Sequence, residues 1–146
     1  MLRFQTAVNV KRPVDEVFAY LSDLDKQAEW SSAVQEVQRD GFGPVAQGTR
    51  YRTRIKMMGR AFDGLNEISD YQPNRRIEFT TLSGPMPYRW DVELAGSDGA
   101  TALTSHTQAE PAGVFKFAAG MIRGAMQRQA QNDFLTLKAI LPVSDQ

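Results

Sequence analysis

The sequence predicts an α+β fold in which a seven-stranded antiparallel sheet curls around one long C-terminal helix. Between residues 34 and 109, apolar and polar residues alternate with the period of two that is typical of half-buried strands. From residue 113 to residue 141 the apolar residues instead recur at steps of three and four, which mark one face of an α-helix. Such a helix needs a surface to cover, and a twisted sheet provides a concave one.

The N-terminal region combines one strand with two short helices. Residues 2–10 alternate between apolar and polar side chains, so the first strand is expected there. Pro13 stands where a helix can begin, and Asp15 and Glu16 suit the positive end of the helix dipole. A second short helix is predicted to end at Trp30. We expect the two helices to follow the first strand and to pack as a V.

The clearest hairpin joins a strand at residues 50–57 to one that begins at residue 60, and a short strand at residues 34–39 precedes it. A two-residue turn at Met58 and Gly59 fixes its register. The predicted pairs are Met57 with Arg60, Ile55 with Phe62, Thr53 with Gly64, Tyr51 with Asn66, Arg54 with Asp63 and Arg50 with Glu67. The opposite charges contribute roughly 0.2 to 1 kcal/mol per pair. The basic residues are therefore interpreted as a solvated outer face and not as a nucleic-acid site.

Three further strands lead to the long helix. They are predicted at residues 76–83, 88–94 and 103–109, separated by breaks at Pro73 and Asn74, at Gly84 to Pro87 and at Gly96 to Gly99. The helix that follows would be about 43 Å long, at 1.5 Å per residue. Pro111 precedes it and Pro142 follows it, so both ends are marked. Its apolar stripe consists of Phe115, Ala119, Ile122, Met126, Ala130, Phe134, Leu137 and Leu141.

The composition restricts the class of protein. A chain of 146 residues is expected to form a single domain over residues 1–146 with its own hydrophobic core. It has no cysteine, which fits a reducing compartment, and we expect a cytoplasmic protein. Residues 1–10 do not form a signal peptide or a membrane span. With 17 basic and 17 acidic residues there is no net charge to attract nucleic acid.

The order of these elements resembles the START-related helix-grip superfamily (START/Bet v 1-like), in particular its polyketide cyclase and dehydrase-like branch. The stretches that carry the resemblance are Arg12, Pro13, Val14, Asp15, Glu16, Val17 and Phe18, then Trp30, then residues 71–79, and the helix of residues 111–141. It covers essentially the whole chain. The resemblance implies a cavity between sheet and helix that holds a small apolar molecule.

Several residues predicted to face inward are small or polar, although a core packed only for stability favours Val, Ile and Leu. We interpret them as keeping space open within a mostly apolar wall, the usual chemistry of a small-ligand pocket. The alternative is a solid aromatic core whose inward threonines are hydrogen-bonded to the backbone. The predicted ligand-binding residues are Tyr51, Thr53, Ile55, Phe62, Asn66, Phe79, Thr81, Tyr88, Trp90, Ser105, Thr107, Phe115, Ala119, Ile122 and Met126.

Few residues are placed to do chemistry in such a cavity. His106 is the only histidine and is predicted to face outward, so histidine-based iron and zinc sites are excluded and no metal is expected. No phosphate-binding glycine loop is present, and no cofactor is expected. The strand carboxylates are assigned to the outer face, except Asp70, which stands near a strand end and is assigned to neither face. Asp133 lies within about a turn of the helix stripe and could reach the floor of the cavity, but a capping or salt-bridge role is favoured.

Two functions remain open for the cavity, and a third, protein interaction through the outer face of the sheet, rests only on Leu65 and the charge ladder. The first is a carrier or sensor that binds a small hydrophobic or lipid-like molecule, without nucleic acid or integral membrane association. The second is a cofactor-free polyketide cyclase, aromatase or dehydratase, in which Tyr51, Tyr88 and Asn66 orient the substrate and no residue is assigned as catalytic. Phe117 and Met121 lie off the helix stripe and are explained equally well by a lid, a homodimer contact or packing against the loop at residues 41–44.

Overall fold

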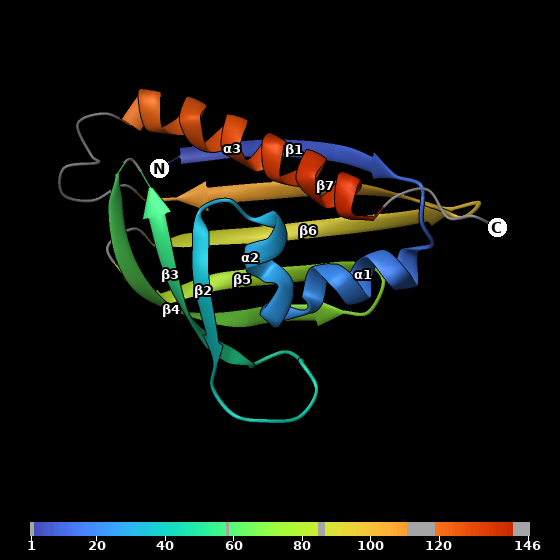
Figure 1. Cartoon of the computed structure of the whole chain (residues 1–146), viewed down its shortest axis with the longest axis horizontal. Coiled ribbons are helices and arrows are strands. Elements are labelled where there is room, and N and C mark those ends of the chain that lie inside the picture. The colour runs from blue at the N-terminus through green and yellow to red at the C-terminus, as the bar shows by residue number, and fades with distance from the viewer. Residues whose placement is uncertain (1, 58, 85–86, 111–118, 142–146) are drawn as a thin grey trace.

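The computed structural model describes residues 2–57, 59–84, 87–110 and 119–141. Its elements follow the predicted order, with a short 3₁₀ turn, η1, before the second helix (Figure 1). They are β1 Leu2–Val10, α1 Val14–Ser22, η1 Leu24–Lys26, α2 Gln27–Trp30, β2 Val34–Arg39, β3 Arg50–Met57, β4 Arg60–Gln72, β5 Arg76–Ser83, β6 Tyr88–Ser97, β7 Ala100–Ala109 and α3 Ala119–Ile140. The predicted start of the long helix falls in residues 111–118, outside the described residues.

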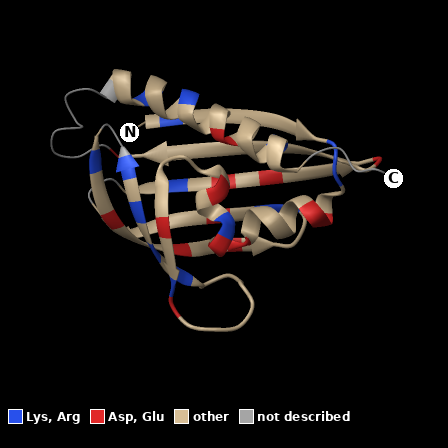
Figure 2. Cartoon of the chain, viewed as in Figure 1, with Lys and Arg blue, Asp and Glu red and all other residues tan. Residues whose placement is uncertain are grey.

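The sheet has seven antiparallel strands in the order β1-β7-β6-β5-β4-β3-β2. The first strand therefore pairs with the last, and the other strands follow one another as a meander. The sheet is strongly curved, and the helices lie over its concave face, with α3 running along β1 and β7 (Figure 1). Basic and acidic residues are interspersed along the strands in this view (Figure 2). The predicted α+β fold is confirmed.

The predicted register of the β3–β4 hairpin is confirmed at every pair. The cross-strand ion pairs are long. The distance from the Arg54 nitrogen to the Asp63 oxygen is 3.9 Å, and the distance from the Arg50 nitrogen to the Glu67 oxygen is 4.0 Å. These side chains are largely exposed, so each pair adds little to stability. The contribution of the charge pairs is therefore at the lower end of the expected range.

The last hairpin is longer than predicted. β6 continues through Gly96 to Ser97 and β7 already begins at Ala100. Only Asp98 and Gly99 form the turn, with φ angles of 51° and 76°. Two consecutive positive φ values match the twist of the flanking strands, which is why Asp-Gly is a favoured hairpin turn. The sequence pattern predicts a strand end at Gly96, but this residue lies within the strand, where an added Cβ would come within 2.9 Å of Val14.

Helix α3 covers the free edge of β1. Three of its side chains, one turn apart, donate hydrogen bonds to backbone carbonyls at every second residue of that strand. They are Arg123 Nε to Arg3 O at 2.9 Å, Gln127 Nε2 to Gln5 O at 3.4 Å and Gln131 Nε2 to Ala7 O at 3.1 Å. Four residues along a helix advance about 6 Å and two residues along a strand about 6.6 Å, so the two repeats nearly match. These bonds satisfy an edge that would otherwise be open to pairing.

The hydrophobic core has two parts. The larger part lies beneath α1, α2 and the C-terminal half of α3 and contains Tyr51, Phe79, Trp30 and Phe134. The smaller part lies near the start of α3, where Ile122 packs against Leu2 and Ala109, with Phe62, Tyr88 and Met126 around it. The space between sheet and helix is therefore filled at both ends of α3.

Candidate functional site

A cavity of about 150 Å³ lies between the sheet, α2 and α3, where the two parts of the core meet. This is the volume of a cavity that holds about one benzene ring. Its lining residues are Phe4, Gln27, Trp30, Ser31, Ala33, Val34, Ile55, Phe62, Tyr88, Trp90, Ser105, Thr107, Met126, Gln129, Ala130, Asp133 and Phe134. Strands from across the sheet and two helices thus contribute to one wall.

Part of the predicted ligand-binding set lines this cavity. These residues are Ile55, Phe62, Tyr88, Trp90, Ser105, Thr107 and Met126. The strand residues among them share the inward parity that the alternation indicates, and Met126 lies on the stripe of α3. Ser105 Oγ and Thr6 Oγ1 share a hydrogen bond of 2.5 Å between β7 and β1, so the Ser105 hydroxyl already has a partner.

The other described members of the set point inward but do not line the cavity. Tyr51 and Phe79 fill the larger core, and Ile122 fills the smaller one. Asn66 donates to Thr53 Oγ1 at 2.9 Å and accepts from Thr81 Oγ1 at 3.3 Å. These polar residues satisfy one another across three strands, so they do not hold space open. Phe115 and the side chain of Ala119 lie outside the described residues.

The aromatic part of the wall contains both tryptophans of the chain. The ring centroids of Trp30 and Trp90 are 5.7 Å apart, and those of Trp30 and Phe134 are 6.5 Å apart. Behind them Phe79 stacks on Trp90 at 4.9 Å. The cavity therefore offers several aromatic faces to a bound molecule, and its occupancy is expected to alter the tryptophan fluorescence.

Opposite the sheet, the cavity has a polar end formed by Gln27, Trp30 and Asp133. All three side chains are buried, with exposed fractions of 7%, 4% and 8%. Asp133 accepts a hydrogen bond from the backbone N–H of Ser32 at 3.1 Å, and burial raises the pKa of its carboxyl group. Within the described chain, Gln27 Oε1 and Trp30 Nε1 have no hydrogen-bond partner. Buried polar atoms rarely lack a hydrogen-bond partner, so the hydrogen bonding at this end of the cavity is incomplete.

Sequence reasoning favours a capping or salt-bridge role for Asp133. Instead it joins α3 to the loop after α2, and no cation pairs with it among the described residues. Two sequence signals favour its inward position: it adjoins Phe134 and stands three residues after Ala130, both on the stripe. No local pattern in the sequence indicates that Gln27 would face the same space.

Tyr51 and Tyr88 are neutral phenols at pH 7. Burial raises the pKa of Tyr51 well above its usual value, and the neighbouring Tyr88 phenol adds to the effect. Burial also raises the pKa of Tyr88 to about 12. Neither phenol can act as a base at pH 7. Since Tyr51 and Asn66 do not line the cavity, Tyr88 alone of the predicted orienting residues does.

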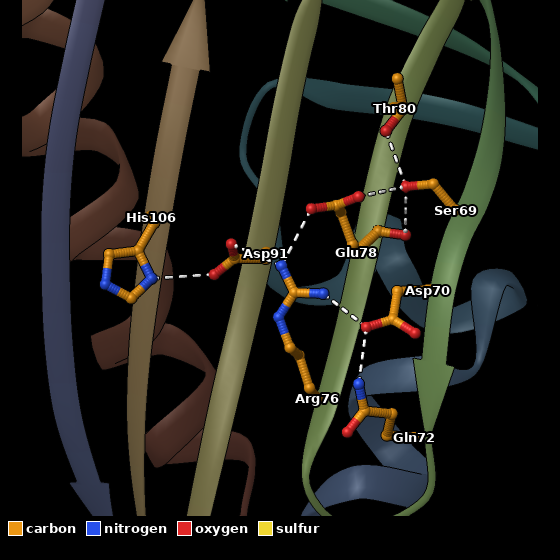
Figure 3. A network of polar contacts seen from close by, with 8 residues as sticks. All are labelled: Ser69, Asp70, Gln72, Arg76, Glu78, Thr80, Asp91 and His106. Carbon is orange, nitrogen blue, oxygen red and sulfur yellow. Dashed lines mark hydrogen bonds and ion pairs between the residues drawn. The ribbon is translucent and has the colours of Figure 1, made fainter.

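The outer face of the sheet carries a separate polar network centred on Arg76 (Figure 3). Arg76 pairs with Asp70 at 2.5 Å, Glu78 at 2.9 Å and Asp91 at 3.0 Å, and His106 Nδ1 lies 2.9 Å from Asp91. The outward assignment of His106 is confirmed. Asp70 also faces outward, because a bulge between Ile68 and Asp70 inserts one residue.

Asp91, Glu93 and His106 bring potential metal ligands within 4.8 Å of one another on this outer face. Both carboxylate oxygens of Asp91 already have partners, because Oδ2 binds Arg76 and Oδ1 binds His106. The arrangement is therefore that of an ion-pair network that joins β4, β5, β6 and β7.

A curved antiparallel sheet that holds a long helix over an apolar cavity defines a helix-grip protein. Residues 1–141 match the family described as "Polyketide cyclase / dehydrase and lipid transport", and the chain belongs to this family. It is thus a member of the START-related superfamily, as its sequence predicts. A comparison with curated protein sequences finds no match. No helix in the described part of the chain is long and apolar enough to cross a membrane.

Solved structures with low sequence identity share the fold. TTHA0849 from Thermus thermophilus superimposes with a TM-score of 0.81 at 15% identity, covering 94% of each chain. The Zhui aromatase/cyclase from Streptomyces sp. R1128 gives 0.76 at 17% identity, covering 95% of this chain and 92% of that one. A START superfamily protein from Mycobacterium smegmatis gives 0.77 at 13% identity, covering 97% of each chain. At these identities the likeness concerns the fold.

Proposed function

We propose that this chain binds a small hydrophobic molecule in the cavity between the sheet and α3, as a carrier or a sensor. The observation that carries the proposal is the cavity itself, which has an apolar aromatic wall and a few polar groups at one end. Small-molecule sites in proteins have this composition. The family to which the chain belongs includes lipid transport in its description, which supports the same function.

The size of the cavity favours a compact ligand. About 150 Å³ accommodates one ring or a short branched chain, as in cavities that bind benzene. The cavity is partly open to solvent, and a polyketide with several fused rings would extend beyond its volume. The volume therefore supports binding of a single-ring compound over folding of a long polyketide chain.

A filled variant tests the proposal. Ala130 is half-buried and lines the cavity from α3, so Ala130→Phe should occupy the space. We expect native mass spectrometry to recover a bound small molecule from the wild-type protein after incubation with cell extract, and no bound molecule from this variant. Ala125→Phe, on the exposed side of the same helix, is the matched control and should bind as the wild type does. Equal recovery from the Ala130→Phe and wild-type proteins would exclude the cavity as the site.

One observation favours the enzymatic alternative, a cofactor-free cyclase or dehydratase. Asp133 is a buried carboxyl group whose pKa is raised by burial, in the same cavity as the Tyr88 phenol. A buried carboxyl group with a raised pKa is a candidate general acid or base. If this function holds, Asp133→Asn abolishes turnover of a single-ring aldol substrate while the substrate still binds. Unchanged turnover in this variant would remove the enzymatic role of Asp133.

A further inference from the structure

The polar end of the cavity indicates what kind of ligand it accepts. We infer that Gln27, Trp30 and Asp133 recognise a protonated amine on a single aromatic ring, which makes the ligand class a small aromatic amine. This inference rests on the proposed function, because it specifies the occupant of the same cavity. Three separate observations support it: the charge of the lining, its unpaired hydrogen-bonding atoms and its aromatic faces.

Among the described residues that border the cavity, one is acidic and none is basic. Asp133 is the acid, and neither lysine, arginine nor histidine is among the described residues that border the space. Tyr88, the other ionisable residue, is a neutral phenol at pH 7. A ligand carboxylate would therefore meet Asp133 without a countercharge, whereas an ammonium group would supply the cation that the described structure lacks. Burial disfavours the lone carboxylate, and a bound cation would relieve that penalty.

The hydrogen-bonding atoms at this end require a donor. Asp133 uses Oδ1 to accept from Ser32, and Gln27 Oε1 has no partner in the described chain although its side chain is 7% exposed. A protonated primary amine carries three N–H donors and can donate to the Asp133 carboxylate; Gln27 Oε1 is shielded from solvent and accepts as well only if its side chain turns towards the cavity.

The aromatic faces suit both parts of such a ligand. Trp30, Trp90 and Phe134 surround the space with centroid separations of 5.7 and 6.5 Å. A cation near the face of an indole is attracted by the ring quadrupole, and the apolar ring of the ligand packs against the same surfaces. With about 150 Å³ available, one ring with a short amine arm fills the cavity.

Three probes of similar shape test the inference with the purified full chain at pH 7. Benzylamine carries the cation, ethylbenzene is its uncharged counterpart, and benzoate carries the opposite charge. Binding is followed by tryptophan fluorescence, since both tryptophans line the cavity, and by calorimetry. We expect benzylamine to bind about tenfold to a hundredfold more tightly than ethylbenzene, the range of a hydrogen bond to a charged group, and benzoate to bind most weakly.

Asp133→Asn should remove the preference for benzylamine while leaving ethylbenzene binding within about threefold, because the side-chain shape is nearly conserved. Asp63→Asn, on the exposed outer face, is the control and should change neither affinity. If Asp133→Asn fails to fold, Gln27→Met tests the same end and should weaken benzylamine alone. Equal binding of benzylamine and ethylbenzene, or a preference for benzoate, would overturn the inference and leave the proposed function intact. Failure of all three probes would overturn both.

Discussion

Replacing Ala130 by leucine tests directly whether the space between α3 and the sheet is hollow. Ala130 is half-buried on the cavity side of α3, between the fully buried Phe134 and the partly buried Met126. Leucine adds three carbons, and each carbon that fills empty apolar space contributes about 0.8 kcal/mol. Full burial would therefore add about 2.4 kcal/mol. Because Ala130 is only half-buried, we expect about 1 kcal/mol of added stability. Leucine and alanine are both strong helix formers, so helix propensity contributes little.

The assay is urea unfolding followed by circular dichroism, with Ala125→Leu on the exposed face of α3 as the control. The control should lie within about 0.5 kcal/mol of the wild type, as exposed substitutions usually do. A solid interior would give the opposite sign, since overpacking a filled core costs about 1–3 kcal/mol. Destabilisation of Ala130→Leu by more than about 1 kcal/mol, with the control unchanged, would refute the cavity on which the proposed function depends.

The remaining predictions concern polar contacts outside the cavity. Hydrogen bonding to Arg76 lowers the pKa of Asp70 below its unfolded value of about 3.9. The ionised carboxylate therefore stabilises the folded protein above that pH, and this stability is lost as the pH falls through the lower pKa of the folded state. Asp70→Asn should therefore be less stable than the wild type at pH 7, with a gap that closes towards pH 2 in urea titrations; a gap independent of pH would contradict the assignment. The double variant Gln127→Ala and Gln131→Ala removes two helix-to-strand hydrogen bonds and should cost about 1 kcal/mol in the same assay. Unchanged stability would show that these bonds do not hold α3 on β1.

The sheet could be predicted from the sequence wherever a short turn fixes the register. The β3–β4 hairpin illustrates this, because one two-residue turn determines every pair that follows it. Prediction is harder beyond Ile68, where the bulge shifts the parity of β4 and places Tyr71, not Asp70, on the inner side opposite Ile77. Alternation alone does not reveal this bulge, since Ser69 is polar, as an outward residue directly after Ile68 would be.

The cavity wall could be predicted only in part. Strand parity correctly indicates which side chains face inward, including Trp90 and Thr107, but not which space each one meets. Thr53 and Thr81 were expected to leave room, yet both hydrogen-bond to Asn66. Asn66 pairs directly with Thr81 and lies diagonal to Thr53, so these contacts follow from the register of three strands, which alternation alone does not give. The contribution of Gln27 depends on how α2 docks against α3, for which the sequence carries no local signal.

The position of α3 explains why a hollow can persist in an otherwise well-packed domain. At one end of the helix Ile122 is fully buried, and at the other end Phe134 and Leu137 are fully buried, while the residues between them border the cavity. Between these two anchors, side chains on the flank of the helix hold it against the carbonyls of β1. The helix is therefore positioned by its ends and its edge, and the middle of its inner face does not need to be filled. An empty space lined with apolar carbon weakens the fold unless something occupies it, and a ligand that enters it restores the missing contacts.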